Sequence, residues 1–175
     1  MSFSTGTTRI CESVSGGLVK SWLISANDME EDGTSVTISG GVVTTLTPKA
    51  GKVFQEFEFE QDTAERRQTA SLENGSLSIL HEIEFFAKKL TTSQRNAIQE
   101  IYDESGCGII AVVKDANALQ WLTGYSEKFT TLRPLRLASG TELSGKAFTD
   151  LNGETVIISS TDNTKDLEFT GTVPV

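Results

Sequence analysis

The stretch from residue 53 to residue 60, VFQEFEFE, alternates strictly from Gln55 onward and is the starting point for interpreting the fold. Successive side chains of a strand point to opposite faces, so this alternation indicates a strand with one buried and one solvated face. Val53, Phe57 and Phe59 make up the apolar face. The opposite face carries four acids, which are Glu56, Glu58, Glu60 and Asp62.

The acidic face of this strand needs an explanation of its own. Neighbours on one face lie about 7 Å apart, and two unit charges at that distance repel each other by roughly 0.6 kcal/mol in water. Two interpretations stay open. Either water solvates an ordinary outer face, since exposed strand faces are normally charged, or the negative field itself has a use.

The composition predicts one folded domain that does not bind nucleic acid or an anionic membrane. The chain has 175 residues, and 15 basic against 24 acidic residues give a net charge of −9. Phosphate binding needs clustered Lys and Arg, which this balance disfavours. No run of 18 apolar residues is present, so no membrane-spanning segment is expected. Residues 1–8 are predicted to form a flexible arm and residues 9–175 the domain.

A polar segment, residues 61–76, separates the first strand from a second strand pattern, LSILHEIEFFAKK, at residues 77–89. We interpret residues 53–88 as a long hairpin whose tip, residues 61–76, is an extended polar loop. Structureless loops of this length are uncommon and usually have a function. Charged residues in this loop are either simply solvated or candidates for contacts with a neighbouring subunit, and they are Glu65, Arg66, Arg67 and Glu73.

One helix is predicted after the second strand. Thr91 and Gln94 form a capping box, and an apolar stripe at helical spacing follows from Ala97 to Tyr102. The stretch TSVTISGGVVTTLTP, residues 34–48, predicts two short strands joined by a turn at Gly40-Gly41. The fold class expected from these patterns is mainly β: an antiparallel sandwich or barrel with one packed helix and a long hairpin arm.

The sequence offers no recognisable catalytic set. His81 is the single histidine and lies within a strand pattern, and no partner for it is identifiable. The acids from Asp28 to Asp32 resemble the start of a calcium loop, but its twelfth position is Ser39. We therefore expect no enzyme activity, no cofactor and no metal ligand. The redox state of Cys11 and Cys107, which lie far apart in the sequence, is left open.

The order of these segments resembles the tail tube proteins of tailed bacteriophages. The resemblance covers most of residues 10–170 and rests on CESVSGGLVKSWL, KVFQEFEFEQDTA, the capped helix after EIEFFAKKL, and VVKDANALQWLTGY with TDLNGETVIISS. It implies a β sandwich with one helix that assembles as hexameric, stacked rings. Neighbouring sheets would line one lumen, and the loop at residues 61–76 would reach an adjacent subunit.

The resemblance also implies a use for the acidic face. A tube that carries DNA should not bind it, and carboxylates in the lumen repel phosphates. The expected lumen-lining residues are Glu56, Glu58, Glu60, Glu82 and Glu84. The expected partners are copies of the same chain and other virion proteins, in a virion tail assembled in the bacterial host cytoplasm. Open alternatives are a neck, tail-completion or decoration protein, the tube of a contractile secretion system, and, more remotely, a carbohydrate-binding module.

Overall fold

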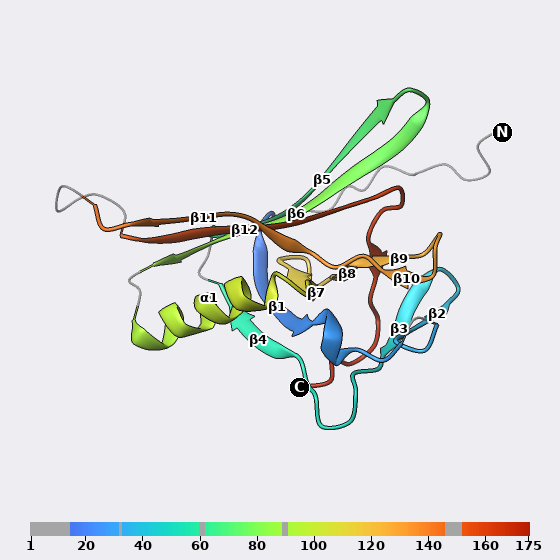
Figure 1. Cartoon of the computed structure of the whole chain (residues 1–175), viewed down its shortest axis with the longest axis horizontal. Helices are drawn as coiled ribbons and strands as arrows, with labels where there is room; N and C mark the ends of the chain where they lie inside the picture. Colours follow the sequence, from blue (N-terminus) through green and yellow to red (C-terminus); the bar gives the residue numbers. More distant parts are fainter. Residues whose placement is uncertain (1–14, 32, 60–61, 89–90, 146–151) are drawn as a thin grey trace.

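The structure is mainly antiparallel β-sheet with one α-helix, as Figure 1 shows. The computed structural model describes five stretches of the chain, residues 15–31, 33–59, 62–88, 91–145 and 152–175. The predicted fold class, an antiparallel mainly-β fold with one packed helix, is confirmed. The arm predicted at residues 1–8 lies outside the described residues. Within those five stretches, no helix is long and apolar enough to cross a membrane.

A five-stranded sheet forms the central layer, with its strands in the order β13-β8-β7-β1-β4. Its strands are β1 (Leu18–Ser25), β4 (Gln55–Glu58), β7 (Ile109–Asp115), β8 (Gln120–Thr123) and β13 (Leu167–Glu168). The run IIAVV of β7 is buried throughout because apolar clusters cover both faces of the sheet. β4 holds Glu56 and Glu58, two of the four acids of the alternating stretch, and lies at one edge of this sheet.

A four-stranded sheet, in the order β11-β12-β6-β5, packs against one face of the central layer. Its strands are β5 (Ala64–Glu73), β6 (Ser76–Lys88), β11 (Arg136–Leu143) and β12 (Gly153–Asp162). Ile83 and Ile158 of this sheet meet Val113 and its neighbours from the central sheet in one apolar cluster. The two sheets therefore pack face to face as a sandwich.

Smaller elements cover the other face of the central sheet. They are β2 (Val36–Ser39), β3 (Val42–Leu46), β9 (Tyr125–Ser126), β10 (Thr131–Leu132) and the short helix η1 (Ala26–Asp28). The turn predicted between β2 and β3 is confirmed, with Gly40 and Gly41 at φ 63° and 83°, where glycine has no steric cost. Val43, Phe54 and Phe169 are fully buried in this second cluster.

The helix α1 (Thr92–Glu104) begins where the capping box predicts. The Gln94 backbone N–H donates to Thr91 Oγ1 at 3.3 Å, and the Thr91 N–H donates to Gln94 Oε1 at 3.1 Å. Ile98 and Ile101 are buried in the cluster between the two sheets. The Tyr102 hydroxyl donates to the buried Glu154 of β12, and burial, together with Glu154, raises the pKa of Tyr102 to about 12. The helix is thereby fixed to the four-stranded sheet.

The prediction of a polar loop at residues 61–76 is wrong. Most of this segment is β5, which pairs with β6 from Ala64 opposite Phe85 to Glu73 opposite Ser76. Asn74 and Gly75, both at positive φ, close the hairpin as a two-residue turn. The hairpin projects beyond the rest of the molecule (Figure 1), so most of its tip faces water on both sides and needs no apolar residues.

The interpretation of residues 53–88 as one hairpin is also wrong. β4 pairs with β1, from Lys20 opposite Glu58 to Leu23 opposite Gln55, and belongs to the other sheet. The hairpin comprises β5 and β6 alone. Alternation identifies a strand but not its partner, and the two strong patterns adjacent in sequence are not adjacent in a sheet.

Candidate functional site

The four-stranded sheet turns one face away from the core, and we call this its outer face. Period-two alternation along β6 buries Ile79, His81, Ile83 and Phe85 and leaves Glu82 and Glu84 on the opposite side. The register places further polar residues beside them on this face, namely Glu65, Arg67 and Thr69 of β5, Thr155, Ser159 and Thr161 of β12, and Ser139 and Thr141 of β11. The same register places Leu80, Phe86 and Lys88 of β6, Ile157 of β12 and Arg136 of β11 on this face, so carboxylates and hydroxyls are mixed there with apolar and basic side chains.

An ion-pair network occupies the β5 side of the outer face. Arg67 donates from Nε to Glu82 at 3.1 Å, forms a second ion pair with Glu65, and lies 3.7 Å from Glu84. The bond to Glu82 and the charges of Glu82 and Glu65 raise the pKa of the Arg67 guanidinium. Three carboxylates surround one guanidinium, so the network keeps a negative excess.

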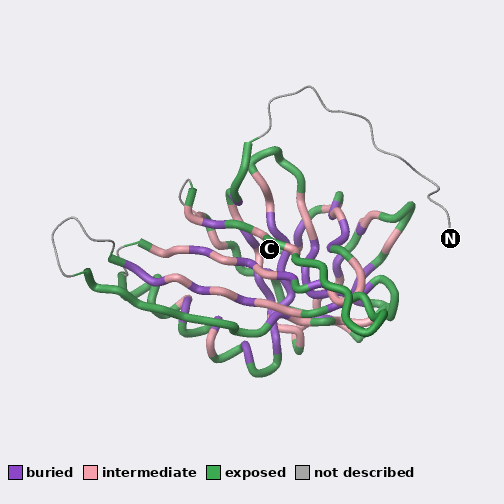
Figure 2. Tube along the Cα trace, turned by 90° about the horizontal axis from the view of Figure 1, so that it is seen from above, coloured by how far each residue is buried: buried purple, intermediate pink, exposed green. Residues whose placement is uncertain are grey.

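Both edges of this sheet are open among the strands that the structure describes. β5 and β11 each have a single neighbour, and every residue of β11 is exposed (Figure 2). Each strand is antiparallel to the next, so β5 and β11 at the two edges also run antiparallel to each other. Unpaired edges present free N–H and C=O groups that can pair with another chain.

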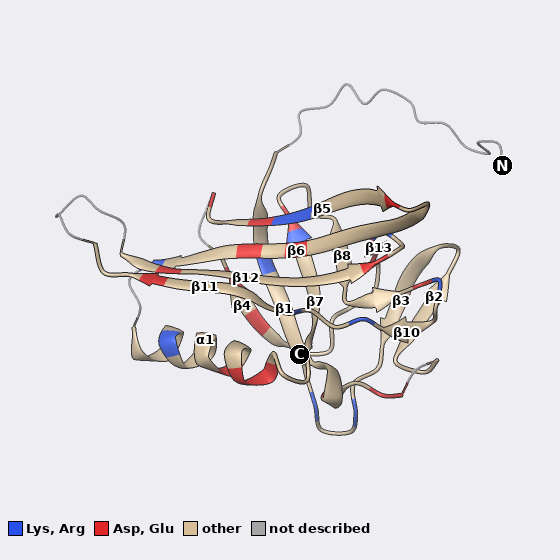
Figure 3. Cartoon of the chain, turned by 45° about the horizontal axis from the view of Figure 1, so that its top comes forward, with Lys and Arg blue, Asp and Glu red and all other residues tan. Residues whose placement is uncertain are grey.

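The acidic stretch of β4 lies elsewhere. Glu56 and Glu58 are on the edge of the central sheet, where both carboxylates contact Lys20, at 2.9 and 3.4 Å. Trp22 Nε1 also donates to Glu56 at 2.9 Å. The pKa of Glu56 is lowered, mainly by the hydrogen bond from Lys20. Glu60 lies outside the described residues. The five predicted lumen residues are therefore not brought together, since Glu82 and Glu84 belong to the other sheet (Figure 3).

The four predicted arm residues also differ in position. Glu65 and Arg67 lie on the outer face, and Glu73 is exposed beside the hairpin turn. Arg66 has the opposite parity and points inward, where its Nη1 donates to Asp166 Oδ2 at 2.8 Å. Arg66 is therefore used within its own chain.

A buried polar cluster surrounds Asp166, just before β13. One carboxylate oxygen accepts from Arg66 and from Thr123 Oγ1, at 2.8 and 2.9 Å, and the other lies 2.9 Å from His81 Nδ1. The Arg66 guanidinium also lies over the Trp121 ring, 4.6 Å from its centre. The cluster joins the β5–β6 hairpin to the central sheet. Burial alone would raise the pKa of Asp166, but its bonds to His81 and Arg66 outweigh burial and lower that pKa.

Sequence reasoning did not identify this cluster. Asp166 has three partners, Arg66, His81 and Thr123, which come from three different strands, β5, β6 and β8. A signal was present: once the Asn74-Gly75 turn sets the register, Arg66 and His81 fall on the inward face of a strand pair. A charged residue on an inward face requires a buried partner.

The Asp166 cluster should make the free energy of unfolding depend on pH in the acidic range. The folded-state pKa of Asp166 lies below its ordinary value of 3.8, so its contribution is complete above that value and is lost as pH falls toward the folded-state pKa. We expect the difference in unfolding free energy between the native chain and an Asp166→Asn variant to shrink as the pH falls below about 5. Urea unfolding at a series of pH values measures this difference. A difference that stays constant down to pH 2.5 would contradict the assignment.

Comparison with known protein families, with curated proteins and with solved structures found no match to this chain.

Proposed function

We propose that this chain is a virion structural protein that assembles through its four-stranded sheet into rings, which stack as a tail tube for DNA passage. The observation that carries this proposal is the sheet itself, with carboxylates on its outer face and two open edges that run antiparallel. A long exposed edge is a liability for a monomer and is normally short, charged or covered. Pairing of β5 in one copy with β11 in the next copy would leave neither edge unpaired.

The directions of the two edge strands are compatible with a ring. A copy related by rotation about an axis nearly parallel to the strands would bring its β5 next to β11 of the first copy. Because these strands run antiparallel within one copy, the new pair would be antiparallel as well. Such head-to-tail contacts close into a ring when the rotation divides a full turn. The outer faces of all copies then form one continuous surface.

That surface would be the lumen if the outer face points toward the axis. Glu82 and Glu84 then line the channel, and the excess negative charge beside Arg67 repels duplex DNA. Basic residues in the same place would hold phosphates with strong salt dependence. In this arrangement Glu56 and Glu58 lie on the other sheet, away from the lumen. The carboxylates proposed to line the lumen therefore include Glu82 and Glu84 but not Glu56 and Glu58, which the sequence alone also indicates.

Polymer length separates the tail tube from related functions. A neck, completion or decoration protein would form a single ring or cap, whereas a tail tube or a contractile secretion tube grows by stacking. A carbohydrate-binding module needs an exposed aromatic platform, but Trp22 and Trp121 are half-buried against the two apolar clusters. The proposed place of action is the virion tail, after assembly in the bacterial host cytoplasm.

Lysine on the β11 edge should stop assembly. We expect Ser139→Lys with Thr141→Lys to leave the fold intact, because both side chains are exposed, and to abolish rings and tubes. Charged residues, lysine above all, protect natural edge strands from pairing. The matched control is Thr37→Lys with Thr45→Lys on the exposed β2–β3 hairpin. Electron microscopy and sedimentation give the readout, and normal tubes from the β11 variant would exclude this edge as the interface.

A further inference from the structure

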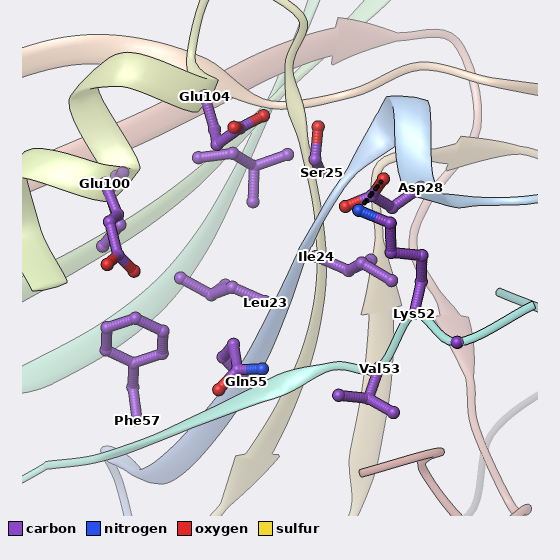
Figure 4. A pocket seen from close by; sticks show the side chains of 13 residues that line it. Leu23, Ile24, Ser25, Asp28, Lys52, Val53, Gln55, Phe57, Glu100 and Glu104 are labelled. Atoms are coloured by element: carbon purple, nitrogen blue, oxygen red, sulfur yellow. Dashed lines mark ion pairs between the residues drawn. The ribbon is translucent and has the colours of Figure 1, made fainter. Parts of the chain in front are cut away.

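A cavity of about 340 Å³ lies between the edge strand β4 and the C-terminal half of the helix α1, and we call it the β4–α1 cavity. Its lining is largely apolar, with Leu23 and Ile24 of β1, Ile101 of α1 and Ile109 of β7 (Figure 4). Val53, which precedes β4, also lines the cavity and is 44% exposed. The cavity is therefore an apolar hollow that opens to the surface.

The charged side chains that line this cavity have a negative excess. Glu100 and Glu104 of α1 are exposed and line its helix side, whereas Asp28 and Lys52 form an ion pair at 3.0 Å and cancel each other (Figure 4). Ser25 Oγ, also at this cavity, is buried and has no hydrogen-bond partner among the described residues. The occupant that fits is an apolar group flanked by cations.

The turn between β9 and β10, residues 127–130, carries such a group. Phe129 is 48% exposed, and it is the one exposed aromatic residue in the part of the chain that the structure describes. Lys128 Nζ and Arg133 Cζ lie 5.5 and 5.3 Å from the centre of its ring, within the range of cation–π contacts. Aromatic and arginine side chains are enriched at the centres of protein interfaces. We call residues 127–130 with Arg133 the β9–β10 tip.

The charge of the β9–β10 tip complements the charge of the cavity. Among the exposed charged side chains of the tip, two cations outnumber the single acid, Glu127. The Asp162 carboxylate near Arg133 is buried and accepts hydrogen bonds from Ser126 and Thr164, so it is engaged within its own chain. The tip therefore presents a positive excess around an exposed ring, and the cavity presents a negative excess around an apolar lining.

The cavity also has room for the Phe129 ring. A benzene molecule occupies an apolar cavity of about 150 Å³, and the β4–α1 cavity is larger, at about 340 Å³. The remaining space can take the aliphatic stem of Lys128 while its ammonium stays in water. Backbone N–H and C=O groups of the turn can supply the hydrogen bond that Ser25 Oγ lacks.

The tip and the cavity of one chain are far apart. Figures 1 and 3 place α1 toward one end of the long axis of the molecule and β9 and β10 toward the other, so the occupant must come from another copy. β11 and β12 run along the same axis (Figure 1). The ring axis proposed above is nearly parallel to these strands, so the tip and the cavity lie toward opposite ends of a ring.

We propose that the β9–β10 tip of one copy docks in the β4–α1 cavity of a second copy. The Phe129 ring lies against the apolar lining, and Lys128 and Arg133 lie beside the two glutamates of α1. In the tube, this contact joins each ring to the next, an assignment that rests on the proposed function. A head-to-tail contact of this kind repeats without closing, as the growth of a tube requires.

Photo-cross-linking from position 129 tests the contact directly. Phe129 is replaced by p-benzoylphenylalanine, an aromatic amino acid that bonds to C–H groups in contact with it under ultraviolet light. The product is mixed with isotope-labelled native chain, so that mass spectrometry identifies links between copies. We expect links to residues 53–57 or 100–104 of the labelled copy. Their yield should be several-fold higher than from the same amino acid at Leu119, which is 43% exposed in the turn between β7 and β8.

Two single substitutions in the labelled copy provide a matched pair. Glu104→Lys should lower the cross-link yield several-fold, whereas Asp103→Lys should lower it little, because Asp103 is an exposed acid of the same helix that does not line the cavity. Added salt should lower the yield as well. A yield at the cavity equal to the Leu119 control, links that map to another face, or equal effects of the two lysine variants would overturn the proposal.

Phe129→Asp separates this contact from ring formation. The side chain is exposed, so we expect the variant to fold and to form single rings but no tubes, whereas Leu119→Asp should form both. Tubes of normal length from the Phe129 variant would exclude the tip as the stacking contact. If the native chain forms neither rings nor tubes, the proposed function fails, and the cross-link yield alone decides whether the tip binds the cavity.

Discussion

Replacing Asp166 with alanine should lower the free energy of unfolding by about 3–5 kcal/mol, because removing one member of a buried ion pair leaves its partners uncompensated. Asp166 is 8% exposed and contacts Arg66, His81 and Thr123. Without its carboxylate, the half-buried Arg66 side chain loses its anion. Urea unfolding monitored by tryptophan fluorescence measures the change, since Trp121 lies beside Arg66.

Thr123→Val is the matched control for this measurement. It removes one hydrogen bond from a neutral hydroxyl to the same carboxylate and conserves the volume of a fully buried side chain. We expect a loss of about 1.5–3 kcal/mol from it, which is the range for a hydrogen bond to a charged group. If Asp166→Ala costs no more than the Thr123 variant, the cluster does not hold the β5–β6 hairpin to the central sheet.

The second large effect concerns DNA passage. If the outer face lines the lumen, then Glu82→Lys with Glu84→Lys should let tubes form but slow or stop DNA delivery. Phosphates would then meet two new lysines beside Arg67, where they now meet the carboxylates of the ion-pair network. The delay should be greatest at low salt, where screening is weakest. The rate of DNA release from virions carrying the variant measures it.

Two control variants distinguish an effect of the position of Glu82 and Glu84 from an effect of total charge. Glu82→Gln with Glu84→Gln removes the same acids without adding cations and should slow delivery much less. Glu30→Lys with Glu31→Lys makes the same charge change in the loop between η1 and β2, away from the outer face. Equal delays from the loop variant and the outer-face variant would show that total charge matters, and not the position of Glu82 and Glu84.

The local structure could be predicted from the sequence where pattern and burial agree. The alternation in β6 and the capping box of α1 each predict their element, because each pattern is a direct consequence of the geometry that buries one face or satisfies the first helical N–H groups. The Gly40-Gly41 turn is predictable for a similar reason, since positive φ strongly favours glycine.

Other features could not be predicted, for identifiable physical reasons. The polar composition of β5 predicts a loop because this strand projects into water and needs no apolar face, and the one local sign of a hairpin is the Asn74-Gly75 turn. The partner of β4 is β1, and nothing in the alternation of either strand specifies that pairing. The Asp166 cluster depends on register as well, because a one-residue shift would turn Arg66 outward.

Electron microscopy of the purified protein at high concentration, combined with sedimentation, tests the central claim most directly. The account predicts rings, or tubes built from them, with an open central channel, and their loss in the Ser139→Lys and Thr141→Lys variant. A single species of 18.9 kDa at every concentration, with neither rings nor tubes in the images, would contradict it.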